Sequence, residues 1–159
     1  MSPTSKVLVI TSCTKRKRKG RGKAKEIYMG PIKNIFLIAD ELNAKCFILS
    51  AKYGIISCED EIESYDKYLG NMSKEEVKEL MDKIKRRCED LKGPWELVIT
   101  NMSSKYAAIL ECPIVAKNAL IIGTPPKGLR AEEARVYKFK TVGEWYSLMK
   151  RIKELLGEL

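Results

Sequence analysis

The sequence contains no histidine and no glutamine among its 159 residues. The absence of histidine excludes the commonest kind of general acid–base catalysis, because imidazole is the side chain that ordinarily titrates near neutral pH. It also removes a usual zinc ligand, and the five cysteines show no Cys-x-x-Cys spacing. The sequence therefore predicts neither a metal site nor a cofactor.

The cysteines are odd in number, which argues against a fully paired disulfide framework. They are Cys13, Cys46, Cys58, Cys88 and Cys112. The lack of glutamine, together with abundant lysine and glutamate, favours a thermophilic source, in which intracellular disulfides occur. The pattern leaves open whether any of the five form pairs.

Long apolar runs are also missing, and none approaches the roughly 18 residues that a membrane span needs. The first five residues, Met-Ser-Pro-Thr-Ser, lack the charged-then-apolar order of a signal peptide. We therefore expect a cytoplasmic protein with no membrane contact.

Positive charge is plentiful and concentrated in one segment. The net charge is +9, and eight of the 30 basic residues lie between Lys15 and Lys25, so the other 22 nearly balance the 21 acidic residues. Such a cluster attracts phosphates and resembles a nucleic-acid-binding arm, although it is also typical of a solvated flexible loop. After Lys15, its members are Arg16, Lys17, Arg18, Lys19, Arg21, Lys23 and Lys25.

Apolar runs and helix signals alternate along the chain. Buried strands are predicted at 6–11, 45–50 and 95–100, and residues 112–124 contain two further strand-like pieces, of which at least one should join the sheet. Helices are predicted from Gly30-Pro31 to residue 42, from the Ser73–Glu76 capping box to the stop at Gly93-Pro94, after Asn101–Ser103, over 131–138, and from the Thr141–Glu144 capping box to residue 156.

This alternation predicts one α/β domain over residues 1–159. We expect a Rossmann-like three-layer sandwich, in which a mostly parallel sheet of about four or five strands carries helices on both faces.

Polar residues follow three of the predicted strands, and the carboxyl ends of parallel strands meet at one edge of the sheet. Hydroxyls, lysines and free backbone N–H groups there suit a phosphate, and tyrosine rings suit a base or sugar. The alternative is that small polar residues simply end strands and begin turns. The candidate ligand-binding residues are Ser12, Thr14, Lys15, Tyr28, Ser50, Lys52, Tyr53, Gly54, Tyr65, Lys105, Tyr106 and Arg130.

Two residues are candidate catalytic groups. Cys13 lies among lysines and arginines, which favour a reactive thiolate, although it can equally be a small residue that shapes a backbone anion nest. Asp66 can act as a general base or as a nucleophile in glycosyl transfer, or it can cap a turn or pair with a lysine. Likewise, Tyr28, Tyr53 and Tyr106 either stack on a base or lie at the core edge with bonded hydroxyls.

Four blocks occur in this order along the chain: Cys-Thr-Lys-Arg at 13–16, which is similar to a Cys-x-x-Lys motif, Ile-Tyr-x-Gly at 27–30, Ile-Leu-Ser-Ala-Lys-Tyr-Gly-Ile at 48–55 and Ser-Tyr-Asp-x-Tyr-Leu at 64–69. Together they resemble an uncharacterised prokaryotic and viral domain family allied to the peroxide-stress protein YaaA. The resemblance implies a Rossmann-like core and a role connected with nucleotides or nucleic acids. The long basic segment after Lys15 departs from the usual pattern of that family.

Three functions remain open on the sequence alone. The first is an enzyme that acts on a nucleobase or nucleotide, with N-glycosidic cleavage or base exchange as its chemistry. The second is a non-catalytic DNA- or RNA-binding protein that uses the basic segment 15–25. The third is a sensor of a small nucleotide in stress or antiviral defence.

Overall fold

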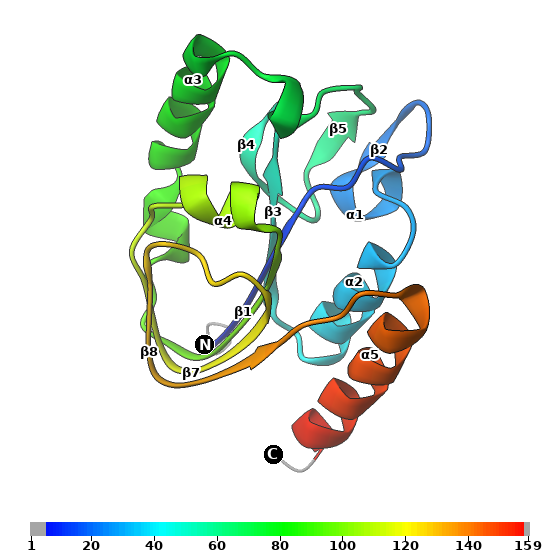
Figure 1. Cartoon of the computed structure of the whole chain (residues 1–159), viewed down its shortest axis with the longest axis vertical. Helices are drawn as coiled ribbons and strands as arrows, with labels where there is room; N and C mark the ends of the chain where they lie inside the picture. Colours follow the sequence, from blue (N-terminus) through cyan, green and yellow to red (C-terminus); the bar gives the residue numbers. More distant parts are fainter. Residues whose placement is uncertain (1–5, 158–159) are drawn as a thin grey trace, which may run out of the picture.

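A six-stranded sheet runs through the computed structural model, which describes residues 6–157 (Figure 1). The α/β class is confirmed, while the predicted count of four or five strands was too low. The strand order is β4-β3-β1-β6-β7-β8, and all neighbours are parallel except β4, which is antiparallel to β3. The strands are β1 (Val7–Ser12), β3 (Lys45–Ser50), β4 (Gly54–Ser57), β6 (Trp95–Met102), β7 (Ile114–Gly123) and β8 (Leu129–Tyr137).

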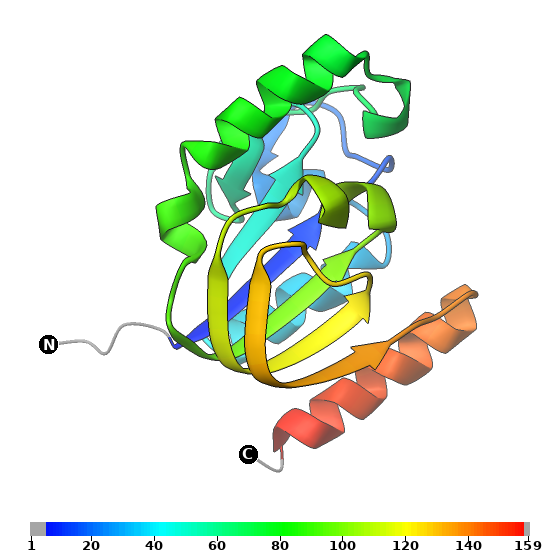
Figure 2. The same ribbon diagram turned by 60° about the vertical axis from the view of Figure 1, so that its left-hand side comes forward.

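Helices pack on both faces because successive side chains of the central strands point to opposite sides. Leu8 and Ile10 of β1 face α3 (Lys74–Lys85), η2 (Cys88–Leu91) and α4 (Ser104–Ile109). Val9, between them, faces α2 (Ile32–Glu41) and α5 (Val142–Gly157). Figure 2 shows α3 and α5 on opposite sides of the sheet. No helix within residues 6–157 is long and apolar enough to cross a membrane.

The predicted helix at 131–138 is wrong, because these residues form most of β8. Alanine, glutamate and arginine favour a helix locally, but the segment pairs with β7 from Leu129 beside Ile114 to Tyr137 beside Ile122. As an edge strand it leaves its charged residues exposed, among them Glu132 and Glu133. The ambiguous stretch 112–124 is one strand, β7, and Figure 2 shows β7 and β8 curving together.

The basic segment is not the flexible loop that its composition predicts. After an isolated bridge between Lys17 and Tyr28, it forms β2 (Arg21–Lys23) and α1 (Ala24–Ile27). β2 pairs with β5 (Glu61–Glu63), a short acidic strand. Ala24 and Ile27 are fully buried, so apolar packing and opposite charges order the segment.

The Ser73–Glu76 capping box is confirmed at the start of α3, and the Thr141 hydroxyl accepts a hydrogen bond from the Glu144 N–H at the start of α5. α3 ends earlier than predicted, at Lys85, and η2 follows it. A 3-10 turn, η1 (Leu69–Asn71), precedes α3.

Four cysteines form two disulfides. Cys46–Cys58 ties β3 to the end of β4, and Cys88–Cys112 ties η2 to the entry into β7. Cys13 stays free. The odd cysteine therefore lies at the end of β1, where the sequence predicts the functional edge.

Candidate functional site

The carboxyl ends of β1, β3 and β6 meet at one edge of the sheet. From β1 the chain passes to α2 on one face, whereas from β6 it passes to α4 on the opposite face. Adjacent strands whose connections leave toward opposite faces create a switch point, and ligands of open α/β sheets bind there. The structure thus brings the three predicted polar strand ends together.

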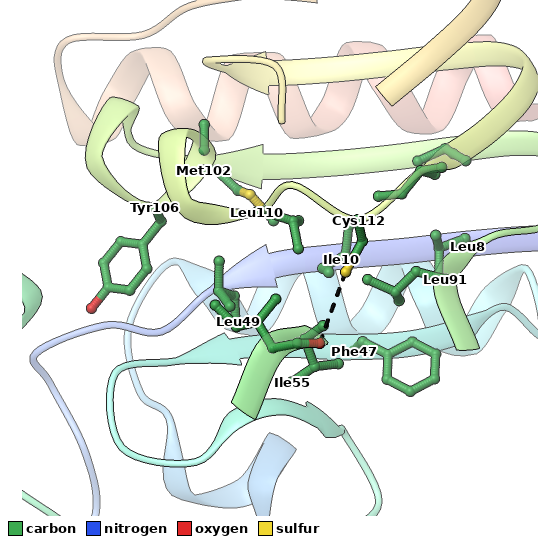
Figure 3. Close-up of a cluster of buried hydrophobic side chains, with 14 of the residues drawn as sticks. Leu8, Ile10, Phe47, Leu49, Ile55, Leu91, Met102, Tyr106, Leu110 and Cys112 are labelled. Atoms are coloured by element: carbon green, nitrogen blue, oxygen red, sulfur yellow. Dashed lines mark hydrogen bonds between the residues drawn. The ribbon is translucent and has the colours of Figure 1, made fainter. Parts of the chain in front are cut away.

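Cys13 and Tyr106 meet across this switch point. The Cys13 backbone N–H bonds to the Leu49 carbonyl of β3 at 2.9 Å, and its thiol donates to the Tyr106 hydroxyl at 3.1 Å. Figure 3 shows Tyr106 at the margin of an apolar cluster, with its hydroxyl pointing away from the cluster. Burial, and then the neighbouring Cys13, raise the pKa of Tyr106. Its hydroxyl therefore stays protonated at neutral pH and can donate to a Cys13 thiolate.

Three hydroxyls form a second group beside Cys13. The Tyr65 hydroxyl lies 2.7 Å from both the Tyr28 hydroxyl and the Ser50 hydroxyl. Ser50 also accepts hydrogen bonds from the backbone N–H groups of Lys52 and Tyr53. Burial raises the pKa of Tyr28 to about 12, and burial followed by Cys13 raises the pKa of Tyr65. The three hydroxyls therefore stay protonated and form a hydrogen-bonded group at the carboxyl end of β3.

The rings of Tyr28 and Tyr106 are not available to stack on a base. Tyr28 is fully buried and Tyr106 is 5% exposed. Their rings belong to the apolar clusters on either side of the sheet. Tyr28 and Tyr106 are therefore residues at the edge of the core, and the prediction that their rings stack on a base is wrong. Tyr53 is half-buried, and its ring meets the Tyr65 ring edge-on.

Lysines lie over the tyrosine rings of this edge. The Lys17 ammonium is 4.4 Å from the Tyr65 ring centre, and the Lys52 ammonium is 5.1 Å from that of Tyr53. The Tyr68 ring centre lies 4.4 Å from the Lys15 ammonium and 5.8 Å from the Lys105 ammonium. Tyr68 was not among the candidate residues. Its place three residues after Tyr65, in the Ser-Tyr-Asp-x-Tyr-Leu block, is the sequence signal that could have identified it.

Residues 7–137 match DUF6884, a family of unknown function. The chain belongs to this family. No curated protein and no solved structure matches it. Every residue named above at the carboxyl ends of β1, β3 and β6 lies inside the family match, whereas α5 lies beyond it.

In this DUF6884 member, Lys17 interacts electrostatically with both candidate catalytic groups. Burial lowers the pKa of Lys17, and the nearby Cys13 and Asp66 act in the opposite direction. The ammonium is thus partly shielded from water and lies near both a thiol and a carboxylate. Asp66 itself is exposed, whereas Cys13 is half-buried and influences the pKa values of Tyr28, Tyr65 and Tyr106. The geometry therefore favours Cys13 over Asp66 as the central group.

Several predicted site residues have structural roles or lie elsewhere. The Thr14 hydroxyl donates to the Arg16 carbonyl and closes the turn after β1, where the neighbouring Ser12 is half-buried. Gly54 has a φ of +78°, and a side chain there would press on Lys83, so it serves the β3–β4 bend. Arg130 lies at the start of β8 and its side chain donates to the Leu129 carbonyl, so the structure does not bring it to the edge.

The basic segment divides into two halves. Glu59, Glu61 and Glu63 form ion pairs with its second half, and Asp40 adds one more; the cations are Arg21, Lys23 and Lys25. In the first half, within the described residues, Lys15, Arg16, Lys17 and Lys19 have no carboxylate within 4.0 Å. The uncompensated charge therefore adjoins Cys13.

Across residues 6–157 no three His, Cys, Asp or Glu side chains gather closely enough to hold a metal ion. A surface groove of about 980 Å³ lies away from this edge and is lined by Val7, Leu97 and Leu120 and by Leu155 and Leu156 at the end of α5. We place the candidate site at Cys13 because a free thiol, hydroxyls and ammonium groups converge there.

Proposed function

We propose that the protein is an enzyme that acts on a nucleotide or nucleobase at the edge formed by β1, β3 and β6. The observation that carries the proposal is the Cys13–Tyr106 contact at the switch point, where the thiol donates a hydrogen bond to the tyrosine hydroxyl. Uncompensated lysines next to it suit the phosphate of such a substrate.

N-glycosidic cleavage or base exchange remains the chemistry we propose. A nucleophile forms a bond to the anomeric carbon while the bond from that carbon to the base nitrogen breaks, and the departing base takes up a proton. Cys13, attacking as the thiolate, is the proposed nucleophile, and the Lys17 ammonium is the proposed donor of the proton that the base takes up. The neutral Lys17 amine then takes a proton from water, whose oxygen bonds to the anomeric carbon while the carbon–sulfur bond breaks and the Cys13 thiolate is restored. Asp66, which also acts on the pKa of Lys17, is the alternative nucleophile.

Two further proposals concern the fold and the kinship of the protein. The parallel strands taken in chain order lie as second, first, third, fourth and fifth, which supports a Rossmann-like arrangement. The blocks that resemble the YaaA-allied domains contain Cys13, Ser50, Lys52 and Tyr65, all of which belong to the edge, and this supports the proposed kinship.

A second function, non-catalytic DNA or RNA binding, is supported by the unpaired first half of the basic segment. The ion pairs of Arg21, Lys23 and Lys25 work against the use of the whole segment as a contact surface. Any such contact would centre on Lys15, Arg16, Lys17 and Lys19.

The test is release of free base from a panel of nucleosides and nucleotides, followed by chromatography. We expect turnover that Cys13→Ser abolishes and that Asp66→Asn reduces much less. Asp82→Asn, an exposed carboxylate on α3, is the matched control and should leave turnover unchanged. Turnover that survives Cys13→Ser but not Asp66→Asn would transfer the nucleophile to Asp66. Turnover that survives both substitutions would rule out the mechanism.

A further inference from the structure

Two lysine ammonium groups from distant parts of the chain lie over the ring of Tyr68. Lys15 follows β1 and Lys105 lies in α4, and both ammonium groups lie within 5.8 Å of the centre of the same ring. In the described structure neither lysine has a carboxylate partner, whereas the adjacent Lys67 pairs with Glu76 at 3.6 Å.

Two positive charges on one ring repel each other. The electron-rich face of a tyrosine attracts each ammonium, typically by about 0.5–1 kcal/mol at an exposed site, but it cannot neutralise either one. An anion between them would remove the repulsion and accept hydrogen bonds from both. A phosphate offers several oxygens for this purpose.

Gly70 maintains the space for this arrangement. A Cβ at this position would lie 2.6 Å from the Tyr68 ring carbon Cε1 and 3.0 Å from the Lys105 ammonium. A side chain there would therefore displace the ring and the ammonium, which are the outer ends of flexible side chains. Close approach favours glycine here and the backbone angle does not, because Gly70 is not among the glycines with positive φ.

The other tyrosines of the edge cannot offer an open ring to a base. The rings of Tyr28 and Tyr106 are buried. The Lys52 ammonium lies over the Tyr53 ring, and the Lys17 ammonium lies over the Tyr65 ring. A ligand that approaches this edge therefore meets ammonium groups before it meets an aromatic face.

We propose that Lys15 and Lys105, supported on Tyr68, bind a phosphate monoester, and that the substrate is recognised by this phosphate and not by its base. The proposal rests on the function proposed above and specifies its substrate class as phosphorylated: a nucleotide or a sugar phosphate, and not a free nucleoside. The phosphate anchors the substrate at Tyr68 while its reacting carbon lies at Cys13.

The first test measures binding to the full chain carrying Cys13→Ser, so that turnover does not interfere. Ribose 5-phosphate, a nucleoside 5′-monophosphate and the matching nucleoside are titrated calorimetrically. We expect both phosphates to bind and the nucleoside to bind at least tenfold more weakly. Lys105→Ala should weaken both phosphates at least tenfold, while Lys74→Ala on exposed α3 should not change them. Equal affinity for nucleoside and nucleotide, failure of both phosphates to bind, or unchanged binding by Lys105→Ala would overturn the proposal.

The second test uses Gly70→Ala, which disturbs Tyr68 and Lys105 without touching Cys13. It should lose phosphate affinity while circular dichroism shows a folded protein. Gly157→Ala, with no atom within 4 Å of the added methyl, is the control and should bind normally. Unchanged affinity in Gly70→Ala would contradict the proposed phosphate site. Base release from unphosphorylated nucleosides would refute only the phosphate recognition, whereas phosphate binding without any turnover would refute only the enzymatic function.

Discussion

The Cys13 thiol donates to the Tyr106 hydroxyl at 3.1 Å, although 93 residues separate them in the sequence. This contact joins the end of β1 to α4 and thereby crosses the point where the strand connections change faces. One hydrogen bond thus connects two distant segments at the free thiol.

Replacing Tyr106 by phenylalanine should destabilise the protein by about 1–2 kcal/mol, because the Cys13 thiol, which is half-buried, loses its hydrogen-bond partner. Urea unfolding at neutral pH measures this. Tyr146→Phe on α5, where the side chain is 53% exposed, is the control and should change the free energy of unfolding by less than about 0.5 kcal/mol. Equal effects of the two substitutions would show that the Cys13–Tyr106 contact contributes nothing to stability.

The two disulfides should each stabilise the fold by about 3 kcal/mol, since they close segments of 12 and 24 residues. The pair Cys88→Ala and Cys112→Ala should lower stability slightly more than the pair Cys46→Ala and Cys58→Ala, because its loop is longer. A thiol titration in denaturant should find one thiol per chain before reduction and five after it. Five thiols before reduction would mean that the pairs do not form in the purified protein.

The parts of the fold predicted correctly are those with a strong local pattern. The Ser73–Glu76 capping box and the apolar runs of β1, β3 and β6 are fixed by neighbours in the sequence. β8 could not be predicted in this way. Its residues favour a helix, and only the long partner strand β7 makes the extended form better.

The same limit applied to the functional edge. The convergence of the strand ends follows from a parallel sheet, so the location of Cys13, Ser50 and Lys105 at one edge could be predicted. Which tyrosines are buried depends on packing against distant segments, so Tyr28 and Tyr106 were assigned to stacking as readily as to the core. The ordering of the basic segment depends on Glu59, Glu61 and Glu63, some 40 residues away, and composition alone did not reveal it.

Stability should fall above pH 10 through the buried tyrosines. The pKa of Tyr28 is about 12 in the folded protein against about 10 in the unfolded chain. The hydroxyl therefore contributes its full stability below pH 10, and that contribution is lost between pH 10 and 12 at about 1.4 kcal/mol per pH unit. The pKa values of Tyr65 and Tyr106 are also raised, so they act in the same direction.

Urea unfolding between about pH 9 and 11 tests this expectation. Tyr28→Phe should be less stable than the wild type near pH 9, because Tyr65 loses a partner, but the gap should narrow as the pH rises. Tyr146→Phe, which keeps all three buried hydroxyls, should follow the wild-type curve. A gap between Tyr28→Phe and wild type that stays constant up to pH 11 would contradict a raised Tyr28 pKa.

The division of the basic segment predicts unequal effects of charge reversal on binding to nucleotides or single-stranded oligonucleotides. Lys15→Glu and Lys17→Glu place a negative charge where no carboxylate balances the cation, so each should weaken binding by at least tenfold at low salt. Arg21→Glu removes a cation whose charge Glu61 and Glu63 already offset, so its effect on binding should be several-fold smaller, although it disturbs the β2–β5 pair. Affinity measured against salt should also show a shallower slope for the Lys15 and Lys17 variants than for Arg21→Glu. If Arg21→Glu weakens binding as much as Lys15→Glu, the anion contacts the whole segment and the second half opens its ion pairs on binding.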